Sequence, residues 1–146
     1  MQNVQCKMQN KEAIIDPARR FIGGKPYDLC ERFLDFSDRV VSVVEALPET
    51  RTGRRIADQL LRSGTSPLGN YEEACAAESR RDFVHKMRIC LKEVRESRAW
   101  LRLTARRKLM NATRLADLID ESDQLARIVG QSIATANRIQ KRKQPK

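Results

Sequence analysis

Six basic side chains recur at helical spacing between residues 81 and 106, and their chemistry suits a phosphate ligand. Four arginines stand seven residues apart, and a lysine and a fifth arginine fall on the same side: Arg81, Arg88, Arg95, Arg102, Lys92 and Arg106. Because seven residues make nearly two turns, these cations would share one helical face over roughly 35 Å. A guanidinium group can donate two hydrogen bonds to one phosphate. The spacing predicts a surface, here called the basic stripe, that contacts the backbone of RNA or DNA.

The positive charge is concentrated in the second half of the chain. The net charge is +10, of which residues 1–78 carry −1 and residues 79–146 carry +11. Residues 80–108 alone hold 11 Lys or Arg against three acids. Such asymmetry favours an anionic partner. The alternative is a solvated face whose charges are partly paired with acids on a neighbouring helix, such as Glu31, Asp35, Asp38 or Glu45.

Groups that read individual bases are missing beside these cations. No recognition-helix pattern is present, and Trp100 is expected in the core or at an interface rather than stacked on a base. Contacts to the backbone alone carry no sequence information and weaken as salt is added. The sequence predicts weakly sequence-specific, salt-sensitive binding, to which the basic tail at 141–146 could add.

Catalytic chemistry is not predicted. His85 is the only histidine, so the second Glu-x-x-His pair that a di-iron centre in a helical bundle needs cannot form. Cys90 lies five residues from His85, on another side of the helix, which argues against a Cys–His nucleophile pair. No phosphate-cradling glycine loop followed by Lys and Ser or Thr is present. We expect no enzymatic activity, no metal and no cofactor.

Composition favours a single helical domain. The chain has 146 residues, of which 33% are charged and 5% aromatic, with few glycines and prolines. This balance argues against a β-sandwich or barrel. No apolar run approaches the roughly 20 residues that cross a bilayer, and the first residues do not resemble a signal peptide. We expect a cytoplasmic protein whose four widely spaced cysteines are reduced.

Apolar periodicity predicts four helices, over about residues 28–47, 50–77, 79–108 and 111–139. Pro48 ends the first, and Thr50 and Ser79 are suitable N-caps for the next two. Leu34 widens the apolar stripe of the first helix, and Leu61 belongs to that of the second. Long amphipathic helices joined by short turns predict an all-α, antiparallel up-and-down four-helix bundle at 26–140. Residues 1–25 are expected to be an N-terminal extension.

A stretch typical of a helix breaker lies at residues 64–69, Gly64-Thr65-Ser66-Pro67-Leu68-Gly69. The apolar face nevertheless stays in register across it. Positions 57, 60, 61, 64, 68, 71 and 75 all fall on one side of a continuous helix. A true loop would not conserve that phase, so one helix with a kink at Pro67, or two nearly coaxial halves, is expected. Ser63, Thr65 and Ser66 could partner the backbone groups that the proline frees or cap the second half of the helix. The glycines would allow close approach of another helix.

Residues 60–101 resemble the 23S rRNA intervening-sequence protein family. The family pattern is roughly L-x-R-S-G-T-S-x-x-x-N-x-x-E-A, followed by K/R-D-F and a helix with L-x-E-x-x-E. The matching residues here are Leu60, Arg62, Ser63, Gly64, Thr65, Ser66, Asn70, Glu73, Ala74, Arg81, Asp82, Phe83, Leu91, Glu93 and Glu96. The first and last helices agree in length and pattern, so the resemblance extends over about residues 26–140. Pro67 departs from the family, which usually has an aliphatic residue there, and the leader is longer than usual.

The resemblance implies a four-helix bundle that assembles as a ring, with a homopentamer favoured. A related branch contains the accessory variability proteins of diversity-generating retroelements, which resemble positively charged pentameric barrels that bind nucleic acid and a reverse transcriptase. The motif residues Arg62, Ser63, Gly64, Thr65, Ser66, Asn70 and Glu73 are then candidates for a subunit interface. Ser66, Asn70 and Glu73 share one helical side, either as a polar site between subunits or as a hydrogen-bond network within the helix.

Two functions are therefore predicted. The first is a non-catalytic, ring-forming protein whose basic stripe binds the backbone of RNA or DNA. The second is a protein-interaction adaptor, such as a reverse-transcriptase accessory protein, whose basic surface docks an acidic partner. A third alternative is a structural oligomer that binds no ligand.

Overall fold

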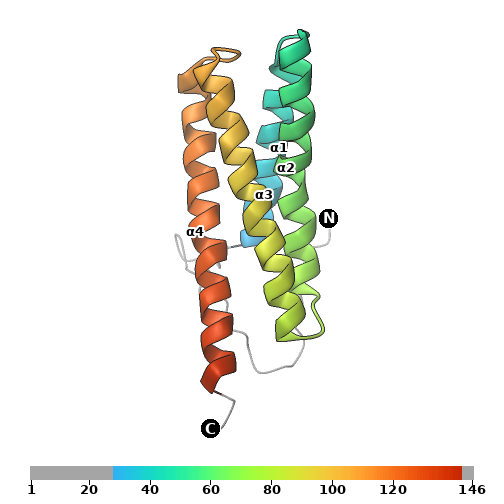
Figure 1. Cartoon of the computed structure of the whole chain (residues 1–146), viewed down its shortest axis with the longest axis vertical. Coiled ribbons are helices and arrows are strands. Elements are labelled where there is room, and N and C mark those ends of the chain that lie inside the picture. Colours follow the sequence, from blue (N-terminus) through green and yellow to red (C-terminus); the bar gives the residue numbers. More distant parts are fainter. Residues whose placement is uncertain (1–27, 143–146) are drawn as a thin grey trace.

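The computed structural model of the chain describes residues 28–142, which form four α-helices. These are α1 (Leu29–Ala46), α2 (Arg51–Cys75), α3 (Arg80–Arg106) and α4 (Ala112–Arg142). Consecutive helices pack side by side and run antiparallel, as Figure 1 shows. The predicted all-α up-and-down bundle is confirmed. The predicted extension at 1–25 and most of the basic tail at 141–146 lie outside the described residues.

The first three helices start close to the predicted positions, where side-chain hydrogen bonds cap them. The Asp28 carboxylate accepts a hydrogen bond from the Cys30 amide, and the Thr50 hydroxyl accepts one from the Gly53 amide, each at 3.0 Å. The Ser79 hydroxyl accepts from the Asp82 amide at 3.1 Å, so the predicted cap of α3 is confirmed. These side chains satisfy amides that have no partner in the first turn of a helix.

Helix α3 ends in a backbone motif that holds Lys108 in the left-handed region, at φ 54°. The Lys108 amide donates to the Ala105 carbonyl, and the Leu109 amide donates to the Thr104 carbonyl. This pair of bonds is a Schellman motif, in which glycine is the usual residue. It allows the chain to reverse into α4, where the Asn111 carboxamide oxygen accepts from the Thr113 amide at 2.9 Å.

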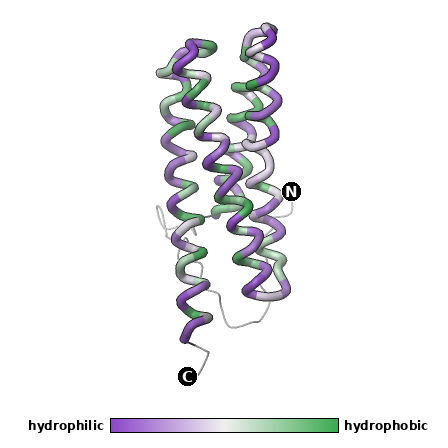
Figure 2. Tube along the Cα trace, viewed as in Figure 1, coloured by the Kyte–Doolittle hydropathy of each residue, from purple (hydrophilic) through white to green (hydrophobic). Residues whose placement is uncertain are grey.

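The core is built from one side of each helix. Apolar and hydrophilic residues alternate along all four helices (Figure 2), and the largest fully buried side chains are Phe33, Phe36, Leu60, Met87, Leu101, Leu115 and Leu125. Two expectations were wrong: Leu34 is 50% exposed and Leu61 is 41% exposed. In α2 the buried residues include Ser63 and Pro67, so the core side of this helix is centred away from Leu61.

Helix α2 runs through Pro67 without interruption, so one helix rather than two halves is confirmed. The bend predicted at Pro67 stays a prediction. The Thr65 and Ser66 hydroxyls donate to the Leu61 and Arg62 carbonyls, each at 2.7 Å. They therefore do not partner the Ser63 carbonyl, whose helical donor the proline removes, and that expectation was wrong.

Helices α1 and α2 approach closely at Gly64. The Ser37 hydroxyl donates to the Gly64 carbonyl at 3.0 Å, and both residues are buried. The Val40 side chain fills the space that a Cβ at Gly64 would occupy. The prediction that a glycine of this segment permits close helix packing is confirmed for Gly64. It does not hold for Gly69, where a Cβ would meet nothing within 4 Å.

Within residues 28–142, no helix has the length together with the apolar character needed to cross a membrane.

Candidate nucleic-acid interface

All six members of the basic stripe are exposed on α3. The opposite side of the same helix supplies buried core residues, among them Phe83, Met87, Cys90, Val94 and Leu101. The stripe and the core thus occupy opposite sides because a helix with period 3.6 separates the two sets of positions. The structure brings the six cations together in one row along the outside of the bundle.

Ion pairs within the described part of the chain leave the basic stripe untouched. Those between helices are Arg32–Glu121, Arg62–Glu93, Arg62–Glu96, Lys86–Glu73 and Arg98–Asp123, and the others are Arg54–Glu49 and Arg127–Asp123. The acids considered for neutralising the stripe belong to α1, which packs against α2 and α4 but not against α3. Neutralisation by Glu31, Asp35, Asp38 or Glu45 is therefore contradicted.

Arg62 of the family motif clamps α2 to α3. Its guanidinium lies 3.2 Å from a Glu93 carboxylate oxygen and also pairs with Glu96, to which the Trp100 indole N–H donates at 3.2 Å. The hydrogen bond that Arg62 donates to Glu96 and the charges of both glutamates raise the pKa of Arg62. In turn, the hydrogen bonds from Arg62 and Trp100 lower the pKa of Glu96. The two acids of the L-x-E-x-x-E motif thus bind an arginine from the L-x-R-S-G-T-S part of the family pattern rather than the basic stripe.

The polar residues Ser66, Asn70 and Glu73 have separate partners inside the chain. Ser66 bonds the Arg62 carbonyl as described above, and the Asn70 side-chain amide donates to the Ser66 carbonyl at 3.0 Å. Glu73 forms an ion pair with Lys86 of α3. The Ser66 and Asn70 contacts agree with the hydrogen-bond network that was one of the two alternatives, whereas Glu73 pairs with another helix. Whether the motif also forms an interface between subunits stays a prediction.

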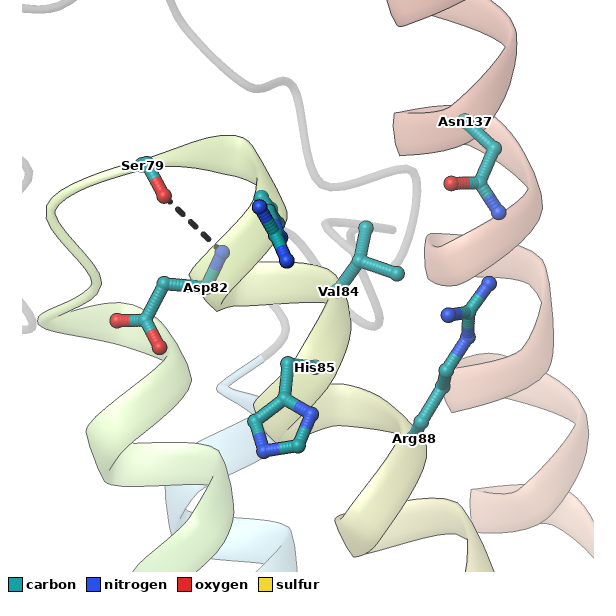
Figure 3. Close-up of a pocket in the computed structure, with 7 residues that line it drawn as sticks. Ser79, Asp82, Val84, His85, Arg88 and Asn137 are labelled. Carbon is teal, nitrogen blue, oxygen red and sulfur yellow. Dashed lines mark hydrogen bonds between the residues drawn. The ribbon is translucent and has the colours of Figure 1, made fainter.

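An open hollow of about 720 Å³ adjoins the N-terminal end of the basic stripe. Six of its lining residues belong to the start of α3 and its cap, and Asn137 belongs to α4; the full set is Ser79, Arg81, Asp82, Val84, His85, Arg88 and Asn137. The close-up in Figure 3 shows Arg88 and Asn137 extending towards one another from the two helices. Sequence reasoning identified Arg81 and Arg88 but missed Asn137, because no spacing rule links residues so distant along the chain.

The described residues hold no cluster of metal-ligating side chains, and one of their cysteines, Cys90, is buried. No group of three or more His, Cys, Asp or Glu side chains at residues 28–142 could hold a metal ion. Burial raises the pKa of the Cys90 thiol to about 12, and the charge of Glu93 acts in the same direction. Its Sγ lies 3.6 Å from the Pro67 carbonyl oxygen, to which the thiol donates. Cys90 is thus a protonated core residue.

The fold and the charge distribution define an all-α four-helix bundle with one cationic outer helix. A sequence profile of the 23S rRNA-intervening sequence protein family matches residues 25–131. The chain belongs to this family, as the motif in residues 60–101 predicts.

A similar solved structure is the crystal structure, at 1.70 Å resolution, of a protein with unknown function from the S23 ribosomal protein family of Bacteroides thetaiotaomicron VPI-5482. The two chains are 30% identical, and their TM-score is 0.68. The similarity covers 73% of this chain and 98% of that one. Among curated proteins, none matches this chain.

Proposed function

We propose that this protein is a non-catalytic, oligomeric nucleic-acid-binding protein that contacts the backbone of RNA or DNA through the basic stripe. The observation that carries the proposal is the row of six exposed cations on α3, none of which pairs with an acid among residues 28–142. A cation that is paired with an acid gains little binding free energy from a polyanion, because its ion pair must first break. Unpaired ones release phosphate counterions on contact, which favours binding.

The chemistry of the stripe favours contact with phosphates over contact with bases. Arginine, which forms five of its six members, presents a planar fork that donates two hydrogen bonds to a phosphate. The indole N–H of Trp100 is engaged with Glu96, so its polar group is already satisfied within the protein. We infer weak sequence specificity, because phosphate contacts position a protein on nucleic acid without reading its sequence.

The salt dependence of binding tests this function. Fluorescence anisotropy of a labelled duplex should show tight binding at low salt and a steep loss as salt is added. Six phosphate contacts per subunit predict a slope of log K against log salt of about −5 on duplex DNA. Absence of binding even at low salt would contradict the proposal. That result, together with capture of an acidic protein partner, would favour the adaptor function instead.

We also propose that copies of the chain associate through the outer flank of α1 and α2, with a pentameric ring favoured by the family resemblance. The two antiparallel helices are tied at Ser37 and Gly64. That register places Leu34 near the level of Leu68, and Leu61 near the level of Val41. Leu34 and Leu61 are exposed, and the other two are half-buried. Exposed apolar side chains that lie close together on neighbouring helices are typical of a protein–protein interface.

Multi-angle light scattering tests the association. The intact chain should have a molar mass several times its subunit mass of 16.8 kDa, with five copies favoured. Replacing both Leu34 and Leu61 with glutamate should reduce the mass to that of one subunit, because two charges would be buried at each contact. Leu103, which is 37% exposed on α3, supplies the control. If Leu103→Glu dissociates the assembly and the double variant does not, the interface lies elsewhere.

A further inference from the structure

The hollow at the start of α3 differs from the rest of the basic stripe because a second helix contributes to it. Along most of α3 the stripe faces solvent, but here Asn137 of α4 stands opposite Arg88 (Figure 3). The volume of about 720 Å³ lies within the range of small-ligand sites in proteins. A ligand in this space could be held from two directions, which a flat row of cations does not allow.

The lining of the hollow is suited to a phosphate group with more than one free oxygen. Arg81, His85 and Arg88 follow one another by one helical turn, so their nitrogen donors face the same space. No ion pair or side-chain hydrogen bond within residues 28–142 engages any of the three. The Asn137 carboxamide adds a neutral donor from the other wall. A terminal phosphate carries more charge and more free oxygens than a phosphodiester, and it can therefore use more of these donors at once.

The one acid of the hollow is directed elsewhere. Figure 3 shows the Asp82 carboxylate pointing away from Arg88 and α4. Lys86 lies within reach of the Asp82 charge. The hydrogen bond to Glu73 and the charge of Glu73 raise the pKa of Lys86, and the charge of Asp82 acts in the same direction. The Ser79 hydroxyl is occupied as the cap of α3, accepting from the Asp82 amide. The donors of Arg81, His85, Arg88 and Asn137 thus face the hollow without a carboxylate aimed at them.

We propose that this hollow binds a phosphomonoester, namely the phosphorylated end of a nucleic-acid strand whose backbone lies along the basic stripe. The inference rests on the proposed function, because the stripe is what brings a strand end to the hollow. Arg81 and Arg88 bind the terminal phosphate, and Asn137 donates to it from α4. A strand ending in a hydroxyl would offer Arg81 and Arg88 only a phosphodiester and would leave the Asn137 donor without a ligand. The protein therefore recognises an end of the nucleic acid in addition to its backbone.

Two oligonucleotides of identical sequence, one with a 5′-phosphate and one with a 5′-hydroxyl, test this assignment on the full chain. The phosphorylated form is expected to bind about tenfold more tightly, which is the contribution of one charge-assisted hydrogen bond. Asn137→Leu, which retains bulk but removes the donor, should reduce the preference for the phosphorylated form, because only Arg81 and Arg88 then contact the terminal phosphate. Equal affinities in the intact chain, or a preference that Asn137→Leu leaves unchanged, would overturn the proposal.

Arg102→Gln supplies the matched control, since it removes a stripe cation outside the hollow. It should weaken both oligonucleotides by the same factor and keep the tenfold preference. If neither oligonucleotide binds, the proposed function fails, and calorimetry with AMP and adenosine then tests the hollow by itself. Binding of AMP but not adenosine would identify a free nucleotide as the source of the phosphate. Binding of neither would overturn the hollow as a phosphate site.

Discussion

A variant with Arg88, Arg95 and Arg102 all replaced by glutamate is expected to lose nucleic-acid binding while keeping its helical fold. Each replacement turns an attraction for phosphate into a repulsion, and the three together shift the net charge of +10 by six units. We expect the affinity at low salt to fall roughly a hundredfold or more. The fold should persist because all three side chains are exposed and lie opposite the core. Gel retardation measures the binding, and circular dichroism measures the helix content.

The matched control changes the same charge at another place. Arg51 and Arg55 of α2 and Arg138 of α4 are exposed, and no ion pair within residues 28–142 includes them. Their replacement by glutamate shifts the net charge by the same six units but leaves the basic stripe intact. Retention should then fall only modestly. Equal losses in the two triple variants would show that total charge, rather than the arrangement on α3, determines binding.

Gly64→Ala is expected to lower the free energy of unfolding by about 1–3 kcal/mol, the usual cost of forcing an extra group into a packed core. A Cβ at this position would lie 2.9 Å from Val40 Cγ2 and still closer to Cγ1. Val40 cannot easily give way, because it is fully buried and β-branched. The Ser37 hydroxyl also ties the two helices together at the Gly64 carbonyl. Separation of α1 from α2 would therefore break a buried hydrogen bond. Urea unfolding followed by circular dichroism measures the change.

Gly69→Ala is the control from the same helix. Gly69 is exposed, and its Cβ would meet nothing within 4 Å. Alanine should raise the free energy of unfolding by about 0.5–1 kcal/mol, because it favours the helix more than glycine does. Both variants must be compared at one protein concentration, since association of subunits adds to apparent stability. A stabilising effect of Gly64→Ala would contradict the close approach of α1 and α2.

Helix boundaries and the core side of each helix could largely be predicted from the sequence. Thr50 and Ser79 cap their helices as predicted, because an N-cap hydrogen bond spans only three residues and depends on little else. The continuity of α2 through Pro67 also followed from local information. The register of the apolar face excluded a true loop at the proline and left one helix or two nearly coaxial halves, of which the structure shows one helix.

The side chains at the edges of the apolar stripes could not be assigned from the sequence. Leu34 and Leu61 have the same periodicity as their buried neighbours, yet each is exposed. Periodicity determines which residues share a face, but the rotation of that face against the rest of the bundle depends on packing with other helices. For the same reason, the sequence identifies Arg62, Glu93 and Glu96 as motif residues but does not pair them. Their ion pairs depend on how α2 packs against α3.

The amino-acid sequence by itself determined the four helices, the family and the row of cations on α3, because helical spacing and capping depend on residues close together in the chain. Only the tertiary structure decided which charges stay unpaired and where the hollow forms. Arg98 and Arg102 are one turn apart on α3, yet Arg98 meets Asp123 of α4 and Arg102 faces solvent. Asn137 reaches the hollow because α4 returns along α3. Such meetings depend on how helices distant in sequence are rotated against one another, which no local pattern encodes.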